Sequence, residues 1–143
     1  MTLISKKWSF GTADLEDAHK IRREVFMVEQ NVSEEEELIE WEDKLSHHLV
    51  IYLNGEAIAT GRIVLNNEIS LGRIAVLKPY RGQKYGEMVM YELLDKAREL
   101  NIPVLYLHSQ TYAIKFYEKF GFVAYGEEFM DAGIPHYHMK LTL

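Results

Sequence analysis

The chain has 143 residues, of which 48% are hydrophobic and 27% are charged, and its formal net charge at pH 7 is -6. This is the composition of a soluble globular protein, and the acidic balance argues against nucleic acid or an anionic membrane surface as a partner, since both attract basic proteins. The chain lacks cysteine, which excludes disulfides, thiolate metal ligands and a cysteine nucleophile and fits a cytoplasmic location. No stretch approaches 18 apolar residues, so we expect one soluble domain over residues 1–143 without a transmembrane helix.

The first predicted elements are a short strand at residues 8–10 and a helix that Thr12 or Asp14 caps. The apolar residues of this helix recur at steps of three and four residues: Ala18, Ile21, Val25 and Val28. An acidic stretch follows at residues 30–44, with a run of four glutamates at positions 34–37. The run is most simply a solvated face, but at the edge of a substrate groove it would attract cationic amines such as polyamines.

A hairpin is predicted where Asn54-Gly55, the strongest short hairpin signal, separates apolar stretches at residues 48–53 and 57–65. Asn66-Asn67 turns the chain again into a strand at residues 69–76. This gives three antiparallel strands in succession.

The remaining elements are predicted by the same patterns: helices at residues 86–100 and 113–120, and strands at residues 104–107, 122–125 and 137–141. Thr111 can cap the second of these helices, and Gly121 can end it in a left-handed conformation. A helix between two strands indicates a parallel crossover at the centre of the sheet. We therefore expect an α/β fold, with a mixed, mostly antiparallel central sheet and helices on both faces.

Residues 81–86, Arg-Gly-Gln-Lys-Tyr-Gly, join a predicted strand to a predicted helix. The first turn of a helix leaves backbone N–H groups unpaired, and its dipole favours anions. Gly82 and Gly86 let a ligand approach the backbone, while Arg81 and Lys84 add positive charge. The loop is a candidate cradle for a phosphate or pyrophosphate, although a tight surface turn with solvated bases has the same pattern.

Tyr117 is a candidate proton donor. It shares a helical face with Ile114 and Phe120, so its hydroxyl points either into a site or into the core. A buried tyrosine normally needs a hydrogen-bond partner, and a phenol can donate a proton in catalysis. From this pattern alone, a core tyrosine and a catalytic one both remain open.

Four stretches of the chain carry a resemblance to a known family. The loop Arg81-x-x-Lys84-x-Gly86 and the stretch Ala113-Ile114-x-x-Tyr117-x-x-x-Gly121-Phe122 resemble the GNAT superfamily of acyl-CoA-dependent N-acyltransferases, over nearly the whole chain. Residues 21–30 and 121–139, the latter with the run Asp-Ala-Gly-Ile-Pro-His, are similar to its ElaA-like branch. The family loop reads Arg/Gln-x-x-Gly-x-Gly/Ala, so Lys84 stands where the family has its central glycine.

The resemblance implies an N-acetyltransferase that uses acetyl-CoA as co-substrate and a primary amine of a small molecule or peptide as acceptor, by direct attack without a covalent enzyme intermediate. It implies that the strand at residues 71–76 splays from its neighbour near a bulge, that its backbone pairs with the pantetheine arm, and that an N–H there holds the oxyanion. Tyr117 would protonate the departing thiolate. The implied acetyl-CoA contacts are Ile74, Ala75, Val76, Arg81, Gly82, Gln83, Lys84, Tyr85 and Gly86. Such folds often form dimers, so a homodimer is an open possibility.

The general base is less well defined by the sequence. The candidates are Glu29, His47, His48, Glu68, Asp131, His136 and His138. Glu29 ranks first because, in this fold, the end of the first helix borders the acceptor site. Histidine has a suitable unperturbed pKa. His136 and His138 share one face of a strand, but no third ligand is evident, so no metal is expected.

Two alternatives to an N-acetyltransferase remain. Residues 25–30 also resemble acyl-homoserine-lactone synthases, although the chain is short for that family. A non-catalytic CoA-binding module would keep the fold without turnover.

Overall fold

The computed structural model describes residues 2–33 and 40–143 and contains one seven-stranded sheet in the order β1-β2-β3-β4-β5-β7-β6. The strands are β1 (Ile4–Phe10), β2 (Ser46–Leu53), β3 (Glu56–Val64), β4 (Ser70–Val76), β5 (Val104–Gln110), β6 (Val123–Asp131) and β7 (Ile134–Thr142). Neighbouring strands are antiparallel except for β4 and β5, which are parallel. The predicted mixed, mostly antiparallel sheet with a central parallel crossover is therefore confirmed.

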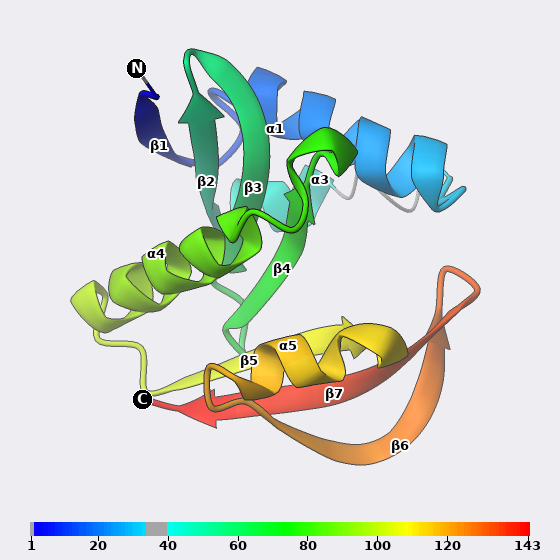
Figure 1. Cartoon of the computed structure of the whole chain (residues 1–143). Helices are drawn as coiled ribbons and strands as arrows, with labels where there is room; N and C mark the ends of the chain where they lie inside the picture. The colour runs from blue at the N-terminus through cyan, green and yellow to red at the C-terminus, as the bar shows by residue number, and fades with distance from the viewer. Residues whose placement is uncertain (1, 34–39) are drawn as a thin grey trace.

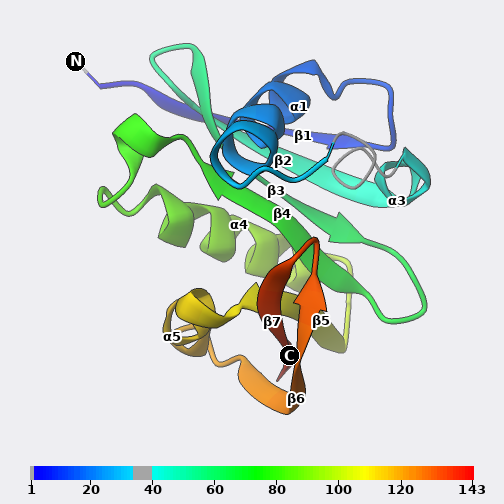
Figure 2. The same ribbon diagram turned by 90° about the vertical axis from the view of Figure 1, so that its right-hand side faces the viewer.

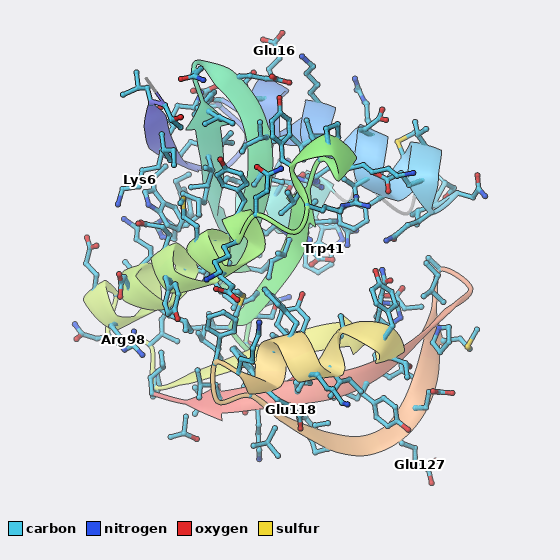
Figure 3. The ribbon with its side chains drawn as sticks, in the orientation of Figure 1. Lys6, Glu16, Trp41, Arg98, Glu118 and Glu127 are labelled. Carbon is cyan, nitrogen blue, oxygen red and sulfur yellow. The ribbon has the colours of Figure 1, made fainter. Side chains whose placement is uncertain are left out.

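Helices cover both faces of the sheet, as predicted (Figure 2). The helical segments are α1 (Glu16–Arg22), the π-helix η1 (Arg23–Glu29), α3 (Glu40–Lys44), η2 (Lys78–Tyr80), α4 (Tyr85–Glu99), η3 (Thr111–Ala113) and α5 (Ile114–Glu118). The buried face of α4, with Val89, Leu93 and Ala97, belongs to the larger apolar cluster, and α1 packs in a smaller cluster on the opposite face. Charged side chains such as Glu16, Arg98 and Glu118 point outward (Figure 3). No helix of the described residues is long and apolar enough to cross a membrane.

The first half of the sheet follows the predicted hairpin. Asn54 and Gly55 have φ angles of 50° and 84°, the two left-handed residues that a type I′ turn requires. Gly61 on β3 faces α4 closely, because a Cβ at this position would lie 2.9 Å from Val89 Cγ1 and 3.0 Å from Leu93 Cδ1. The helix therefore packs closely on the strand backbone, and a side chain at position 61 would force Val89 and Leu93 to shift.

The first helix differs from the prediction in two respects. Neither Thr12 nor Asp14 is the N-cap; Leu15 has that position and provides no side-chain hydrogen bond. Val28 is 65% exposed, although Ala18, Ile21 and Val25 are buried as expected. The reason is the change from α-helix to π-helix at Arg23, since the wider turn rotates later residues away from the phase of the α-helical pattern. The glutamate run at positions 34–37 lies outside the described residues.

The last helix and strands also differ in detail. The Thr111 hydroxyl donates to a Glu128 carboxylate oxygen at 3.2 Å and does not cap α5. Gly121 has the predicted left-handed conformation, with φ at 95°. The strands β6 and β7 are longer than predicted, because Ala132 and Gly133, both at positive φ, connect them in a tight hairpin.

The centre of the sheet opens into two diverging halves. The ladder between β4 and β5 contains one residue pair, Ser70 with Tyr106, and the strands then separate (Figure 1). On its other side, β4 carries an irregularity opposite residues 60–62 of β3, where Arg73 has a φ of 49°. Such a bulge bends a strand and increases its twist, which turns β4 away from β5. The splay and bulge implied for this strand are thus present.

Candidate active site

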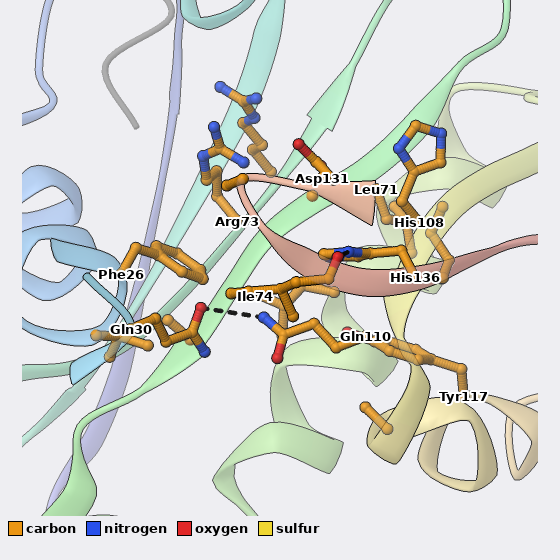
Figure 4. Close-up of a pocket in the computed structure, with 18 of the residues that line it drawn as sticks. Phe26, Gln30, Leu71, Arg73, Ile74, His108, Gln110, Tyr117, Asp131 and His136 are labelled. Carbon is orange, nitrogen blue, oxygen red and sulfur yellow. Dashed lines mark hydrogen bonds between the residues drawn. The ribbon is translucent and has the colours of Figure 1, made fainter. Parts of the chain in front are cut away.

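A cleft of about 740 Å³ lies between the diverging parts of β4 and β5. Its walls come from η1, β4, the start of α5 and the hairpin between β6 and β7. Figure 4 shows Ile74 on β4 near the middle of the cleft, with Tyr117 and Arg73 toward different ends. The cleft thus collects residues from segments that are far apart in the sequence.

The loop at residues 81–86 borders the cleft and a second hollow of about 350 Å³. The first backbone bond of α4 runs from Met88 N–H to the Lys84 carbonyl, so the N–H groups that precede Met88 in this helix have no partner in its ladder. Gly82 has a φ of 78°, and no atom lies within 4 Å of a Cβ built on it. This open backbone at a helix N-terminus is suited to a phosphate group.

Lys84 departs from the family pattern at a position whose left-handed backbone conformation favours glycine. Its φ and ψ angles are 69° and 16°, the left-handed conformation. This conformation costs an ordinary residue roughly 1–2 kcal/mol, which explains why a glycine is usual there. The lysine keeps the loop geometry at that cost and contributes its side chain to the wall of the smaller hollow.

Arg81 and Glu29 are brought together by the fold. Two guanidinium nitrogens of Arg81 donate to the two carboxylate oxygens of Glu29, each at 2.8 Å, and Arg81 Nε donates to the Val76 carbonyl at 2.9 Å. Arg81 therefore ties the end of η1 and the end of β4 to the loop. The predicted roles of Glu29 as base and of Arg81 as a phosphate contact remain predictions, and each would involve a side chain that already has partners.

Tyr117 lines the cleft from α5. Burial, and to a smaller extent the nearby Tyr112, raises the pKa of Tyr117 above its usual value, so the phenol keeps its proton at neutral pH. Within the described part of the chain, no group lies in hydrogen-bonding distance of its hydroxyl. A protonated hydroxyl without a protein acceptor can donate to a group that enters the cleft.

Among the seven candidate bases, Asp131 and His136 line the cleft. His136 Nδ1 lies 2.7 Å from the Ile134 carbonyl, which can only accept, so Nδ1 carries a hydrogen and, in the neutral imidazole, the lone pair is on Nε2. The other histidines have different surroundings. His48 is buried and contacts the Asp43 carbonyl, His47 packs on Phe10, and His138 stacks with Phe129. No cluster of three metal-binding side chains occurs among residues 2–33 and 40–143.

A buried ionic cluster lies behind the cleft and joins α1, α3 and β3. Asp43 accepts hydrogen bonds from Arg22 at 3.0 Å and from Arg62 at 2.7 Å, and all three side chains are almost fully buried. Burial alone would raise the pKa of Asp43, but the two guanidinium groups outweigh it and lower that pKa to about 2. The carboxylate is therefore charged over the whole working range of pH.

Several residues of the cleft had not been predicted. Gln110 on β5 donates to Gln30 at the end of η1 at 3.0 Å, and this bridge crosses the cleft (Figure 4). His108, whose pKa is lowered by burial and by His138, also lines the cleft, as do Arg62 and Arg73. The glutamine bridge joins positions 80 residues apart, and no local pattern marks such a pair.

Comparison with known proteins identifies the family. Residues 12–143 match the acetyltransferase (GNAT) domain, so the chain belongs to the GNAT family and is an acyltransferase. It is 40% identical over 127 residues to YjcF of Bacillus subtilis, described as an uncharacterized N-acetyltransferase; the match covers 87% of this chain and 90% of YjcF.

ElaA of Escherichia coli is similar in both sequence and structure. The sequences are 31% identical over 128 residues, 84% of this chain and 82% of ElaA. The crystal structure of ElaA has a TM-score of 0.84 at 26% identity, over 96% of this chain and 99% of that chain. The predicted ElaA-like branch is therefore confirmed. A GNAT family acetyltransferase from Elizabethkingia anophelis with acetyl-CoA bound shares the fold, with a TM-score of 0.74 at 15% identity over 98% of each chain.

Proposed function

We propose that this enzyme transfers the acetyl group of acetyl-CoA directly to a primary amine of a small molecule or peptide. The observation that carries the proposal is the cleft between β4 and β5, which has an open helix N-terminus at one end and a protonated tyrosine in its wall. Membership of the GNAT family and the acetyl-CoA in a protein of the same fold support the choice of donor.

The residues of the cleft and loop fit an acyl-CoA thioester. The backbone N–H groups of residues 83–86 would hold the pyrophosphate, with Lys84 beside them. The backbone of β4 at Ile74, Ala75 and Val76 would bind the pantetheine arm as an added strand. When bound, the thioester supplies a carbonyl that is already activated for attack.

The remaining chemistry belongs to the side chains and backbone of the cleft. His136 Nε2 removes a proton from the ammonium form of the acceptor, whose nitrogen then attacks the thioester carbonyl. A backbone N–H of β4 stabilises the oxyanion, a contribution typically worth about 3 kcal/mol. Tyr117 gives its proton to the sulfur as the C–S bond breaks, which releases CoA as the thiol. The second proton, which the acylated nitrogen loses as the amide forms, then restores the Tyr117 hydroxyl. Glu29 stays an alternative base.

The first test is isothermal titration of the purified protein with acetyl-CoA and with CoA. We expect micromolar binding of acetyl-CoA, about -8 kcal/mol, because the loop has open backbone donors. No heat at millimolar ligand would contradict the proposal and favour a different use of the fold. Binding without thiol release across a broad amine panel would instead favour the non-catalytic CoA-binding module.

A variant of the loop tests the role of Lys84 in the same titration. Lys84→Gly restores the residue that the left-handed backbone favours and removes one positive charge. If the ammonium helps to bind the pyrophosphate, affinity falls several-fold; if the side chain crowds the site, affinity rises. In both cases the affinity is compared with that of the wild type, and the substitution leaves the acceptor end of the cleft unchanged.

A further inference from the structure

Arg62 is a buried cation with one hydrogen-bond donor directed to no described group. The residue is 3% exposed. Its two terminal nitrogens donate to Asp43 at 2.7 Å and to Glu42 at 3.3 Å. Its Nε is buried and has no hydrogen-bond acceptor among the described residues. An unsatisfied buried donor on a charged group is costly, so a retained one points to an external partner.

The buried Arg62 Nε lies beside a gap in the wall of the cleft above Gly72. Arg62 and Gly72 are paired across β3 and β4, so their side-chain positions lie on the same face of the sheet. A Cβ on Gly72 would lie 3.8 Å from Arg62 Nε, and no other atom would lie within 4 Å of it. Gly72 does not have a left-handed φ, so its backbone does not require glycine. The missing side chain instead leaves open space next to the Nε, in the wall of the cleft that both residues line.

A second guanidinium lies at the same part of the cleft. Arg73 lines the cleft and packs against Phe26, with its guanidinium carbon 5.7 Å from the centre of the ring. Burial, then Arg73 and Arg22, lower the pKa of Arg62, while Asp43 opposes them. The neighbouring cations therefore repel Arg62, and an incoming anion would relieve this repulsion.

We propose that Arg62, reached through the gap above Gly72, and the adjacent Arg73 bind a carboxylate of the acceptor, so that the acceptor is an amino acid or an amino-acid-like amine. The inference rests on the proposed function and specifies its substrate class. A planar carboxylate matches donors on guanidinium groups, and charge-assisted hydrogen bonds are the stronger class. Arg73 on β4 and His136 on β7 face the same cleft (Figure 4), so one small molecule can contact the arginines with its carboxylate and the base with its amine.

The proposal predicts that the enzyme prefers amines with a carboxylate, whereas an acidic groove would prefer cationic amines without one. Each acceptor is paired with the amine left when its carboxylate is removed, for example lysine with cadaverine and phenylalanine with phenylethylamine. With saturating acetyl-CoA, kcat/KM is measured from release of the CoA thiol. We expect the amino acid of a reactive pair to be favoured about tenfold or more, because only it makes the charge-assisted bonds. Equal rates, or faster acetylation of the decarboxylated amines, overturn the proposal.

Gly72→Ala is the decisive variant, because Arg62 variants remove a partner of Asp43 and risk unfolding. The added methyl group fills the gap beside Arg62 Nε without a clash and without backbone strain. We expect the preference for the carboxylate to fall several-fold, while the melting temperature and the acetyl-CoA affinity stay as in the wild type. If Gly72→Ala keeps the wild-type preference for acceptors with a carboxylate, the proposal is contradicted.

A binding measurement keeps the proposal testable even where turnover is slow. N-acetyl amino acids and the corresponding neutral N-acetyl amines are titrated into the protein saturated with CoA. Tighter binding of the carboxylates, reduced by Gly72→Ala, supports the proposal. Equal binding, or no binding by either class, overturns it. Failure of acetyl-CoA itself to bind is a separate result, which contradicts the proposed function.

Discussion

Tyr117 has the protonation state that a proton donor needs. Its pKa is raised by burial, so the hydroxyl is intact wherever the amine can react. We expect Tyr117→Phe to lower kcat about 100-fold or more, within the usual range for a general acid, because the thiolate must then leave unprotonated or take a proton from water. The measurement is steady-state thiol release, together with acetyl-CoA titration, which should show an affinity within about twofold of the wild type.

A matched control separates this role from a loss of packing. Tyr91 on α4 is 60% exposed, lies outside the cleft and packs on Phe120, so Tyr91→Phe removes a hydroxyl with no catalytic assignment. Its kcat should match the wild type. Full activity in Tyr117→Phe would reject the acid role and leave Tyr117 as a core tyrosine.

His136 and Glu29 make different predictions as bases. His136→Asn keeps an N–H donor for the Ile134 carbonyl and removes the Nε2 lone pair. We expect kcat near neutral pH to fall about 100-fold or more, with partial recovery at high pH, where the amine loses its proton unaided. Acetyl-CoA affinity should not change.

Glu29→Gln serves as the comparison for His136→Asn. Because Arg81 holds Glu29 next to the loop at residues 81–86, the proposed phosphate site, the loss of the Glu29 carboxylate should act chiefly on acetyl-CoA binding. A large loss of kcat with normal acetyl-CoA affinity in Glu29→Gln, and a mild effect of His136→Asn, would reverse the assignment and return Glu29 to the role of base.

At the scale of elements, the cluster around Asp43 fixes the wall of the cleft that η1 and α3 form. The same carboxylate binds Arg22, the last residue of α1, and Arg62 on β3. Removing one member of a buried ion pair leaves uncompensated charge and typically costs 3–5 kcal/mol. Asp43 therefore helps to hold the first helix on the sheet, together with the apolar cluster beneath α1.

Asp43→Asn should lower the free energy of unfolding at pH 7 by about 3–5 kcal/mol, measured by urea denaturation. The pKa of Asp43 falls from 3.8 to about 2 on folding, so its stabilising charge is fully present above pH 4 and is lost as the pH falls toward 2. The gap between wild type and variant should narrow over that interval. Asp14→Asn is the control, because Asp14 is 54% exposed in its ion pair with Lys7 and should contribute less than about 1 kcal/mol. A gap that is independent of pH down to 2 would contradict this account.

At the scale of the whole molecule, sequence patterns predict the structural features that depend on residues close together in the sequence. The Asn54-Gly55 hairpin, the left-handed Gly121 and the buried face of α4 depend on residues within a few positions of one another, and all three are present. The change to a π-helix at Arg23 shifts the exposure of Val28 out of the α-helical period, so that period could not reveal it.

The site divides in the same way. The loop at residues 81–86 has its glycines and basic residues within one hexapeptide. Its position at the open N-terminus of a helix could therefore be predicted from the sequence. The bridge between Gln30 and Gln110, and the gap that Gly72 leaves over Arg62, arise only when strands are aligned. Neither Gly72 nor Arg62 can be recognised as part of a site from the sequence, because they become neighbours only through the register between β3 and β4.

The splay of the sheet leads to a prediction about backbone exchange. Leu77 N–H bonds to the Ile58 carbonyl of β3, and alternate residues of a strand bond to the same neighbour, so the N–H group of Val76 points away from β3. On that side, β4 pairs with β5 only at Ser70, so this amide has no strand to bond. It should exchange hydrogen rapidly in the free protein.

Acetyl-CoA should slow this exchange if its pantetheine arm binds as an added strand. We expect at least a tenfold slowing at Val76, measured by NMR at saturating acetyl-CoA, since this amide would then bond to the ligand. Ligand binding also stabilises the whole fold, so Val50 in β2, a strand paired on both sides, reports the general effect, and the slowing at β4 must exceed it. Slowing confined to residues 81–86 would show that the loop holds the pyrophosphate while the arm takes another path. In that case β4 would not bind the pantetheine arm, and the oxyanion donor of the proposed mechanism would have to lie elsewhere.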